Sequence, residues 1–125
     1  MTGGRILHVA PGYPPRNLGG RERHVQDLAR AQAAAGRDVT VFCADLSGDT
    51  PAGGVGEEVD GAVRVLRAGR PVVEGVFSDF HSPTIEAAFQ RVLRDRTPDI
   101  VHVHCLNSLS NGIPVLTRAA GAVLV

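Results

Sequence analysis

An apolar run near the N-terminus, followed by a proline-rich loop and a pair of glycines, constrains the fold of this chain more than any other feature. Residues 6–10 are apolar apart from His8. Such a run is typical of a parallel strand that is covered on both faces, and less so of a half-exposed strand. A helix must follow this strand and pack back on the sheet, and Gly19 and Gly20 stand where that helix begins. The stretch therefore predicts the first strand, loop and helix of an open α/β sheet.

The glycine pair has two interpretations. Without a Cβ on Gly19 or Gly20, a ligand can approach the free backbone N–H groups at the positive end of the helix dipole, and such a turn suits a phosphate. Alternatively, two adjacent glycines form only a turn that requires positive φ. The position of the pair favours the ligand site, because ligands bind open α/β sheets outside the carboxyl ends of the strands.

The rest of the chain alternates between helix and strand patterns. Ser82 followed by Pro83 is typical of the start of a helix, and Asp60-Gly61 is a strong turn dipeptide for a hairpin. Gly36 suits the position just after a helix. Helices are predicted over about 20–35, 83–95 and 110–120, and strands over 38–43, 57–67 (as a hairpin), 99–105 and 122–125.

These elements predict an α/β fold with a Rossmann-like, three-layer parallel sheet. When the strand after the hairpin turn is counted as the third, the predicted spatial order is 3-2-1-4-5. The first strand then lies at the centre and residues 122–125 lie at one edge, with helices on both faces. The unpaired edge favours pairing with a second copy, so a dimer is one expected partner. Because the chain stops inside an apolar strand, we expect it to be a fragment of something longer.

Composition narrows the class of protein. The 125 residues with 43% apolar content predict one domain. The 13 basic and 13 acidic residues balance, so nothing in the net charge indicates nucleic acid or an anionic membrane as a partner. The absence of a signal peptide and of a long apolar run predicts a cytoplasmic protein with no transmembrane segment. Cys43 and Cys105 each end a predicted strand, which favours reduced thiols over a disulfide and excludes a C-x-x-C metal site.

Three short motifs follow one another over nearly the whole chain: RILHVAPGYPP at 5–15, GGRERHV at 19–25 and PDIVHVH at 98–104. In this order and at this spacing they resemble the N-terminal domain of family-4 glycosyltransferases of the GT-B fold. Members of that family pair two Rossmann-like domains across a cleft and transfer a sugar from an activated donor to an acceptor, with retention of configuration. The resemblance implies that residues 1–125 are the acceptor-side domain. It also implies that the donor-binding domain, with its Glu-x7-Glu motif, is absent, so the chain alone should be inactive.

The resemblance also implies a set of site residues. Gly19 and Gly20 match the family's glycine pair, whose backbone faces the donor diphosphate. His104 matches the second histidine of the family's His-x-His. It is expected to act by orienting the acceptor hydroxyl or the transferred sugar, and not as a general base. The substrates are a nucleotide-sugar and an acceptor, with no cofactor. Residues expected on the acceptor side are Tyr13, Arg16, Arg21, His24 and Asn107, with Arg21 replacing the family's usual small or apolar residue.

His8 and His102 are expected to have no role in the reaction. His8 is expected to be a hydrogen-bonded core residue, and His102 to lie near the middle of the sheet. His24 is open to a second interpretation as a packed surface residue. Because the histidines look scattered and no carboxylate stands at ligand spacing, no metal site is expected.

Two alternatives compete with the glycosyltransferase. The first is a dinucleotide-binding Rossmann domain of an oxidoreductase, in which Asp45, just past the second strand, holds a ribose. Against it, the first loop lacks G-x-G-x-x-G and is too long for a dinucleotide turn. The second is a flavodoxin-like interaction domain, which needs an acidic cluster after the first strand. No such cluster is present in the sequence.

Overall fold

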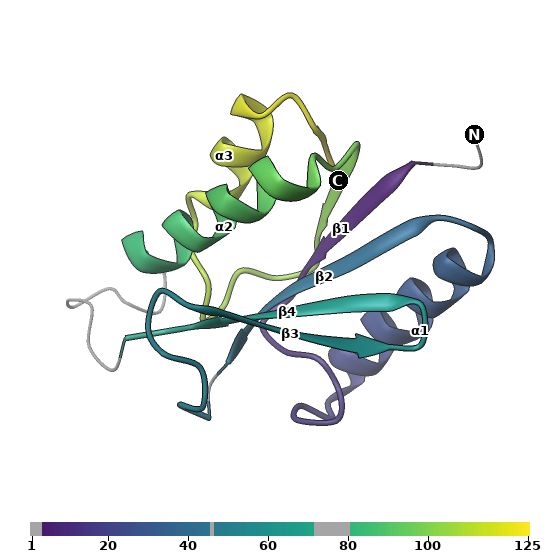
Figure 1. Cartoon of the computed structure of the whole chain (residues 1–125), viewed down its shortest axis with the longest axis horizontal. Coiled ribbons are helices and arrows are strands. Elements are labelled where there is room, and N and C mark those ends of the chain that lie inside the picture. The colour runs from purple at the N-terminus through teal and green to yellow at the C-terminus, as the bar shows by residue number, and fades with distance from the viewer. Residues whose placement is uncertain (1–3, 46, 72–80) are drawn as a thin grey trace.

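The computed structural model, which describes residues 4–45, 47–71 and 81–125, contains one six-stranded sheet with the order β3-β4-β2-β1-β5-β6 (Figure 1). All neighbouring strands are parallel except β3 and β4. The elements in chain order are β1 (Arg5–Val9), α1 (Gly20–Ala34), β2 (Asp38–Asp45), β3 (Val55–Asp60), β4 (Val63–Gly69), α2 (Pro83–Arg96), β5 (Ile100–Val103), α3 (Ile113–Ala119) and β6 (Val123–Leu124).

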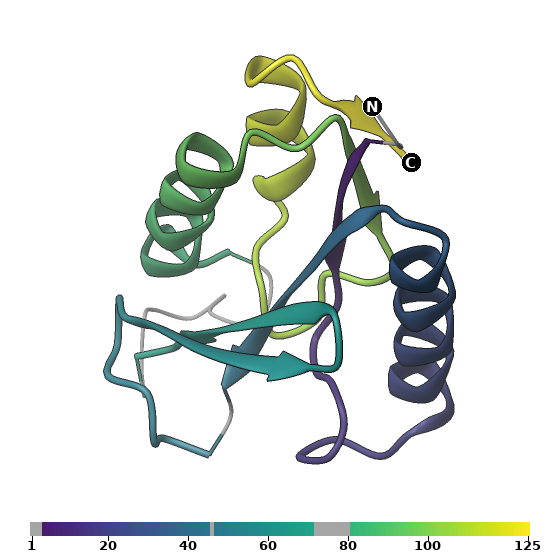
Figure 2. The same ribbon diagram turned by 45° about the vertical axis from the view of Figure 1, so that its right-hand side comes forward.

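Strand β1 is the centre of the sheet, as predicted. It pairs with β2 on one side and with β5 on the other, so that Leu7 lies opposite both Thr40 and Val101. Helix α1 covers one face of the sheet, and α2 and α3 cover the other (Figure 2). Leu7 and Val9 pack with α2 and α3, whereas the α1 face has its own apolar cluster around Val25. The three layers follow from this two-sided burial.

The predicted strand order was wrong at one edge. The first arm of the predicted hairpin is a full strand, β3, which pairs antiparallel to β4 outside the five predicted strands. The sheet is therefore mixed and has six strands. Asp60 pairs with Val63, and Gly61 with φ 61° lies in the tight turn between them, as the Asp-Gly signal indicated. Glu57 and Glu58 on β3 are exposed, which suits an edge strand.

Helix ends agree with the sequence signals at two of the three helices. Gly36 follows α1 with φ 92°, in the conformation that glycine adopts at low cost. The Ser82 side chain caps α2 by accepting a hydrogen bond from the Ile85 N–H. Helix α3 begins at Ile113, later than predicted. Ser110 belongs instead to the preceding turn, where its hydroxyl accepts from the Ser82 N–H at 3.1 Å.

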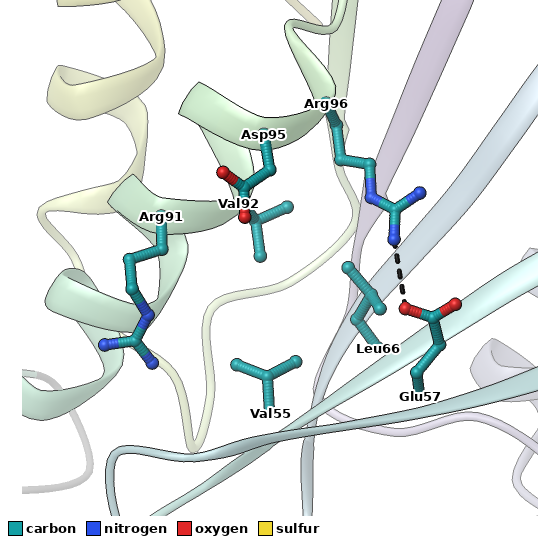
Figure 3. Close-up of a pocket in the computed structure, with 7 residues that line it drawn as sticks. All are labelled: Val55, Glu57, Leu66, Arg91, Val92, Asp95 and Arg96. Atoms are coloured by element: carbon teal, nitrogen blue, oxygen red, sulfur yellow. Dashed lines mark hydrogen bonds and ion pairs between the residues drawn. The ribbon is translucent and has the colours of Figure 1, made fainter.

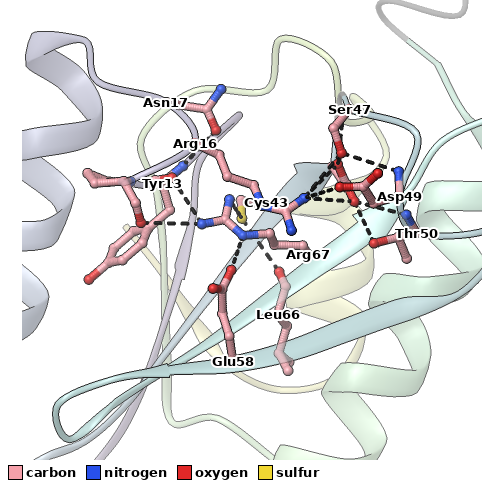
Figure 4. A network of polar contacts seen from close by, with 12 residues as sticks. Tyr13, Arg16, Asn17, Cys43, Ser47, Asp49, Thr50, Glu58, Leu66 and Arg67 are labelled. Atoms are coloured by element: carbon pink, nitrogen blue, oxygen red, sulfur yellow. Dashed lines mark hydrogen bonds and ion pairs between the residues drawn. The ribbon is translucent and has the colours of Figure 1, made fainter.

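Arg67 on β4 is the least expected feature of the core, because its side chain is charged and only 4% exposed. Its Nη2 donates to the carbonyl oxygens of Tyr13 at 3.0 Å and Pro14 at 3.3 Å. Its Nε pairs with Glu58, and its Nη1 lies 3.6 Å from the Cys43 Sγ (Figure 4). One buried cation therefore ties the loop after β1 to strands β2, β3 and β4.

Replacing this cation tests how strongly it holds the loop. Arg67→Met keeps most of the packed volume but leaves the two loop carbonyls without their donor, so we expect the free energy of unfolding to fall by about 2–3 kcal/mol. Urea denaturation measures the change. Arg64→Met on the same strand is the control, because Arg64 is 43% exposed and pairs with the exposed Glu57. Equal, small losses of stability in both variants would contradict the conclusion that Arg67 holds the loop after β1.

Candidate functional site

The candidate site lies at the carboxyl ends of β1 and β5, where the loop of residues 11–19 leaves the sheet. His104 directly follows β5, and its backbone N–H donates to the Val9 carbonyl oxygen at 2.9 Å. The side chain therefore stands beside the end of β1, at the edge where parallel α/β sheets bind ligands. The sequence predicted this position for His104.

Three histidines form a cluster on the α1 face of the sheet. His8 Nδ1 lies 2.9 Å from His104 Nε2. The rings of His102 and His104 stack with 4.0 Å between their centroids, and those of His8 and His102 are 5.4 Å apart. Alternation along β5 places His102 and His104 on one face, and the parallel register places His8 opposite His102.

Gln32 on α1 fixes the orientation of the cluster from the other side. His8 Nε2 lies 2.6 Å from the Gln32 Oε1. Because an amide oxygen only accepts, His8 carries its proton on Nε2, and its Nδ1 is an acceptor. His104 Nε2–H therefore donates to His8 Nδ1. Sequence reasoning missed this role of Gln32.

The expectation that the histidines are scattered was wrong. His8 is a buried, hydrogen-bonded core residue as predicted, but one of its partners is His104 itself. One ligand atom each from His8, His102 and His104 lies within 4.8 Å of the others. Strand alternation was visible in His102-x-His104, but the third member depends on the β1–β5 register, which no sequence signal gave.

The cluster lowers its own proton affinity. Burial, and then the neighbouring histidines, lower the pKa of His104 to about 4 from the usual 6.5. Burial also lowers the pKa of His8, against the opposing effect of its hydrogen bond to Gln32. Both imidazoles are therefore neutral at neutral pH, and His104 donates a hydrogen bond as an uncharged ring.

The glycine pair does not need its glycines for backbone conformation. Gly19 is the N-cap of α1 with φ −71°, and neither Gly19 nor Gly20 has a positive φ. The interpretation of a positive-φ turn was therefore wrong. A Cβ on Gly20 would meet nothing within 4 Å, whereas one on Gly19 would lie 2.4 Å from the Glu22 Oε2. No side chain of the described residues forms a cap hydrogen bond at Gly19, so the first N–H groups of α1 have no side-chain cap.

The predicted acceptor-side residues fall into two groups. His24, Arg21 and Asn107 are exposed, and the His24 ring lies edge-on to His104 with 6.1 Å between centroids. Tyr13, by contrast, is fully buried, and its hydroxyl donates to the Asp60 Oδ2 at 2.6 Å. That bond and the charge of Asp60 add to burial in raising the pKa of Tyr13. The structure thus brings His24 to His104 and keeps Tyr13 inside the core.

Arg16 turns toward the end of β2. Its Nη1 lies 3.4 Å from carboxylate oxygens of both Asp45 and Asp49, and 3.1 Å from the Ser47 Oγ. The Asp45 side chain is 1% exposed. It accepts from the backbone N–H groups of Ser47 and Thr50 at 2.9 and 3.0 Å, and from both hydroxyls. These bonds, above all those from the hydroxyls, lower the pKa of Asp45 well below its usual range.

This network bears on the dinucleotide alternative. A ribose needs a free carboxylate after the second strand. Asp45 has the predicted position, but both of its oxygens are engaged by its own loop. Asp45 therefore serves as the anchor of its own loop, which argues against the dinucleotide-binding alternative.

A separate pocket lies on the opposite face, between α2 and the β3–β4 hairpin (Figure 3). It has a volume of about 290 Å³, and Arg96 Nη2 and Glu57 Oε1 pair at 3.0 Å at one side of it. None of the predicted site residues lines it. Its lining consists of Val55, Glu57, Leu66, Arg91, Val92, Asp95 and Arg96.

Comparison with known proteins decides the family. The family model described as a glycosyl transferase 4-like domain matches residues 19–125. The chain belongs to this family. The resemblance drawn from the sequence motifs is confirmed, and the mostly parallel α/β sheet is consistent with it.

Two curated relatives extend the family assignment. They are glycogen synthases of Mycobacterium tuberculosis, from the strains CDC 1551 / Oshkosh and ATCC 25618 / H37Rv. Each is 39% identical over 113 aligned residues, which cover 80% of this chain and 27% of the relative. The chain therefore spans about a quarter of the length of these relatives.

Within the residues that the structure describes, no helix has the length and apolar content to cross a membrane.

The lowered pKa values predict a pH dependence of stability. Because the pKa of His104 is about 4 in the folded chain and 6.5 otherwise, the unfolded chain takes up the proton first as the pH falls. The free energy of unfolding should therefore decrease as the pH falls from about 6.5 to about 4. Asp60, whose pKa is lowered to about 2, contributes only at lower pH.

Urea denaturation across this pH range measures the effect. His104→Gln keeps an N–H donor without a titrating ring, so its stability should change less steeply with pH. Gln90→Ala changes an exposed residue that does not titrate and lies outside the cluster, so it should keep the original slope. Identical slopes for all three proteins would contradict the prediction.

Proposed function

We propose that this chain is the acceptor-side domain of a retaining glycosyltransferase, of hexosyltransferase type, that uses a nucleotide-sugar donor. Membership of the family supports the reaction class, and the name of the relatives, glycogen synthase, supports a hexose as the transferred unit. A second domain would hold the base and ribose of the donor. The 125 residues alone would then bind donor weakly and transfer no sugar.

One observation carries the placement of the site. His24, which lies one helical turn beyond Gly20 on α1, has its ring 6.1 Å from that of His104. The uncapped start of α1 and the end of β5 therefore share one space at the carboxyl edge of the sheet. A donor diphosphate at the glycine pair and an acceptor at His104 would be neighbours there.

His104 acts in this proposal by position. Its lowered pKa makes it a poor proton acceptor near neutral pH, which fits a group that orients a hydroxyl and does not remove its proton. Its Nε2 is bonded to His8, and His8 is held by Gln32. The ring is thereby fixed before substrate arrives, which is how a positioning group contributes to rate.

The diphosphate would meet one opposing charge. The Glu22 carboxylate lies against Gly19 at the start of α1, where its negative charge interacts favourably with the helix dipole. A bound diphosphate would take over that interaction and displace the flexible side chain. Gly20, with nothing within 4 Å of its Cβ position, leaves the approach open.

The position of His104 generates the first functional prediction. In the full-length enzyme, His104→Ala should lower the transfer rate by about a hundredfold, because misplacement of a reacting group costs about this much. Donor affinity should change little. Steady-state transfer at saturating acceptor measures the rate, with His81→Ala as the control outside the site. Unchanged turnover of His104→Ala would remove His104 from the active site.

The glycine pair generates the second functional prediction. Because the space around Gly20 is empty, Gly20→Ala and Gly20→Val should both fold with nearly unchanged stability. In the full-length enzyme, Gly20→Val should raise the donor KM strongly, and Gly20→Ala should raise it less, since the larger side chain stands where phosphate approaches. Equal donor KM values for Gly20→Val and the unaltered enzyme would exclude the glycine pair as the diphosphate site.

Two expectations from the sequence stay predictions. The cytoplasmic location was inferred only from the lack of a signal peptide and of a long apolar run in the sequence. The dimer would use the free edge of β6, which pairs with β5 alone in the described part of the sheet and carries Val123, 60% exposed. Light scattering at increasing protein concentration tests the dimer.

A further inference from the structure

We propose that His8, His102 and His104 bind a divalent transition-metal ion, with zinc as the best fit. The site lies between the central strands and α1, and goes beyond the sugar-transfer reaction. His8 lies on β1 and His102 on β5, and His104 directly follows β5 and is half-buried. Figure 2 shows α1 on the face of the sheet toward which the cluster lies, beside the central strands.

The three ligand atoms lie close enough to meet at one metal ion once the rings of His102 and His104 turn toward it. Zinc holds histidine nitrogens at about 2.0–2.1 Å in a tetrahedron, so ligand atoms lie roughly 3.3 Å apart. The three histidines offer one nitrogen each within 4.8 Å of the others. His8 Nδ1 and His104 Nε2, at 2.9 Å, would separate by a few tenths of an ångström. The rings of His102 and His104, which are half-buried, can turn to allow this.

Gln32 supplies the support that a ligating histidine needs. Histidine ligands donate their second ring N–H to an oxygen acceptor, which fixes the tautomer and the ring plane. His8 has this arrangement, with Nε2 at 2.6 Å from the Gln32 Oε1 and Nδ1 directed to the cluster. Its Nδ1 lone pair is therefore ready for a metal ion in place of the hydrogen bond from His104.

The donor set selects the class of metal. Three neutral imidazoles suit zinc, copper, nickel or cobalt, and lack the oxygen ligands that magnesium and calcium require. On binding, His104 Nε2 gives its lone pair to the metal, and the proton on that nitrogen moves to Nδ1 of the same ring. Three protein ligands leave a fourth position for water. His24 is the next histidine to the cluster, with its ring 6.1 Å from that of His104.

A metal ion here would compete with sugar transfer. Without the metal, His104 Nε2–H donates to His8, and the Nδ1 lone pair can accept a hydrogen bond from an acceptor hydroxyl. With the metal on Nε2, Nδ1 carries the proton and can no longer accept that bond. Zinc should therefore inhibit the full-length enzyme, and a chelator should reverse the inhibition. This consequence rests on the proposed function, whereas metal binding itself does not.

Metal titration of the 125-residue chain tests the site without any sugar. We expect one equivalent of Co²⁺ to give the visible absorption of tetrahedral cobalt, and Zn²⁺ to displace it. We also expect Zn²⁺ to raise the thermal unfolding temperature, since a ligand of the folded state stabilises it. Absence of a saturable cobalt signal would overturn the proposal.

Single variants locate the ion. His102→Ala should abolish the cobalt signal and the thermal shift, and Gln32→Leu, which removes only the support of His8, should weaken binding by about tenfold or more. His81→Ala, outside the cluster, should bind as the unaltered chain does. Circular dichroism checks that each variant is folded, and His104→Gln replaces His102→Ala if the latter is not. Binding that survives the loss of a cluster histidine would show an adventitious surface ion and overturn the proposal.

Discussion

Parallel pairing of β1 with both β2 and β5 is the constraint on which the rest of the structure depends. It forces the carboxyl ends of these strands to one edge, and it requires helices on both faces because neither face of β1 can meet water. The same pairing brings the end of β5 to the end of β1, where the His104 N–H bonds to the Val9 carbonyl. The proline-rich loop, the start of α1 and the histidine cluster therefore gather at one place. The position of the candidate site is therefore determined by the strand topology, and the side chains determine only its chemistry.

Much of the fold could be predicted from the sequence because its signals are local. Ser82, Gly36 and Asp60-Gly61 act through their own backbone neighbourhood, and each lies where its chemistry indicated. The hairpin was predicted, but its first arm was left out of the strand order, because a short arm with Glu57 and Glu58 resembles the flank of a turn until its partner strand is placed. The histidine cluster needed one more step. Its third member comes from a neighbouring strand, and pairing register is a property of two segments that neither encodes alone.

The least predictable part of the site is which of its polar side chains are already hydrogen-bonded to, or paired with, other residues of the chain. Tyr13 and Arg16 stand in the loop that a ligand would approach, and their residue types suit a sugar or a phosphate. In the structure, Asp60 engages the Tyr13 hydroxyl, and Asp45 and Asp49 engage Arg16. Arg67 reads as an ordinary strand-end cation, yet it is the buried donor that holds the loop backbone. Sequence supplies the inventory of polar groups, and only the packed chain shows which are free.

The carboxylate of Asp45 carries a lesson for protein engineering. Related α/β domains use an acid at this position to grip a nucleotide ribose, so conversion of this chain to a cofactor binder looks like a matter of grafting a glycine-rich turn. Here Asp45 already anchors the loop of residues 47–50 by accepting hydrogen bonds from the backbone N–H groups of Ser47 and Thr50. Any redesign would first have to release it, and the loop would then lose the anchor that folds it back on β2. Cofactor grafting into this domain therefore begins with a replacement anchor for that loop.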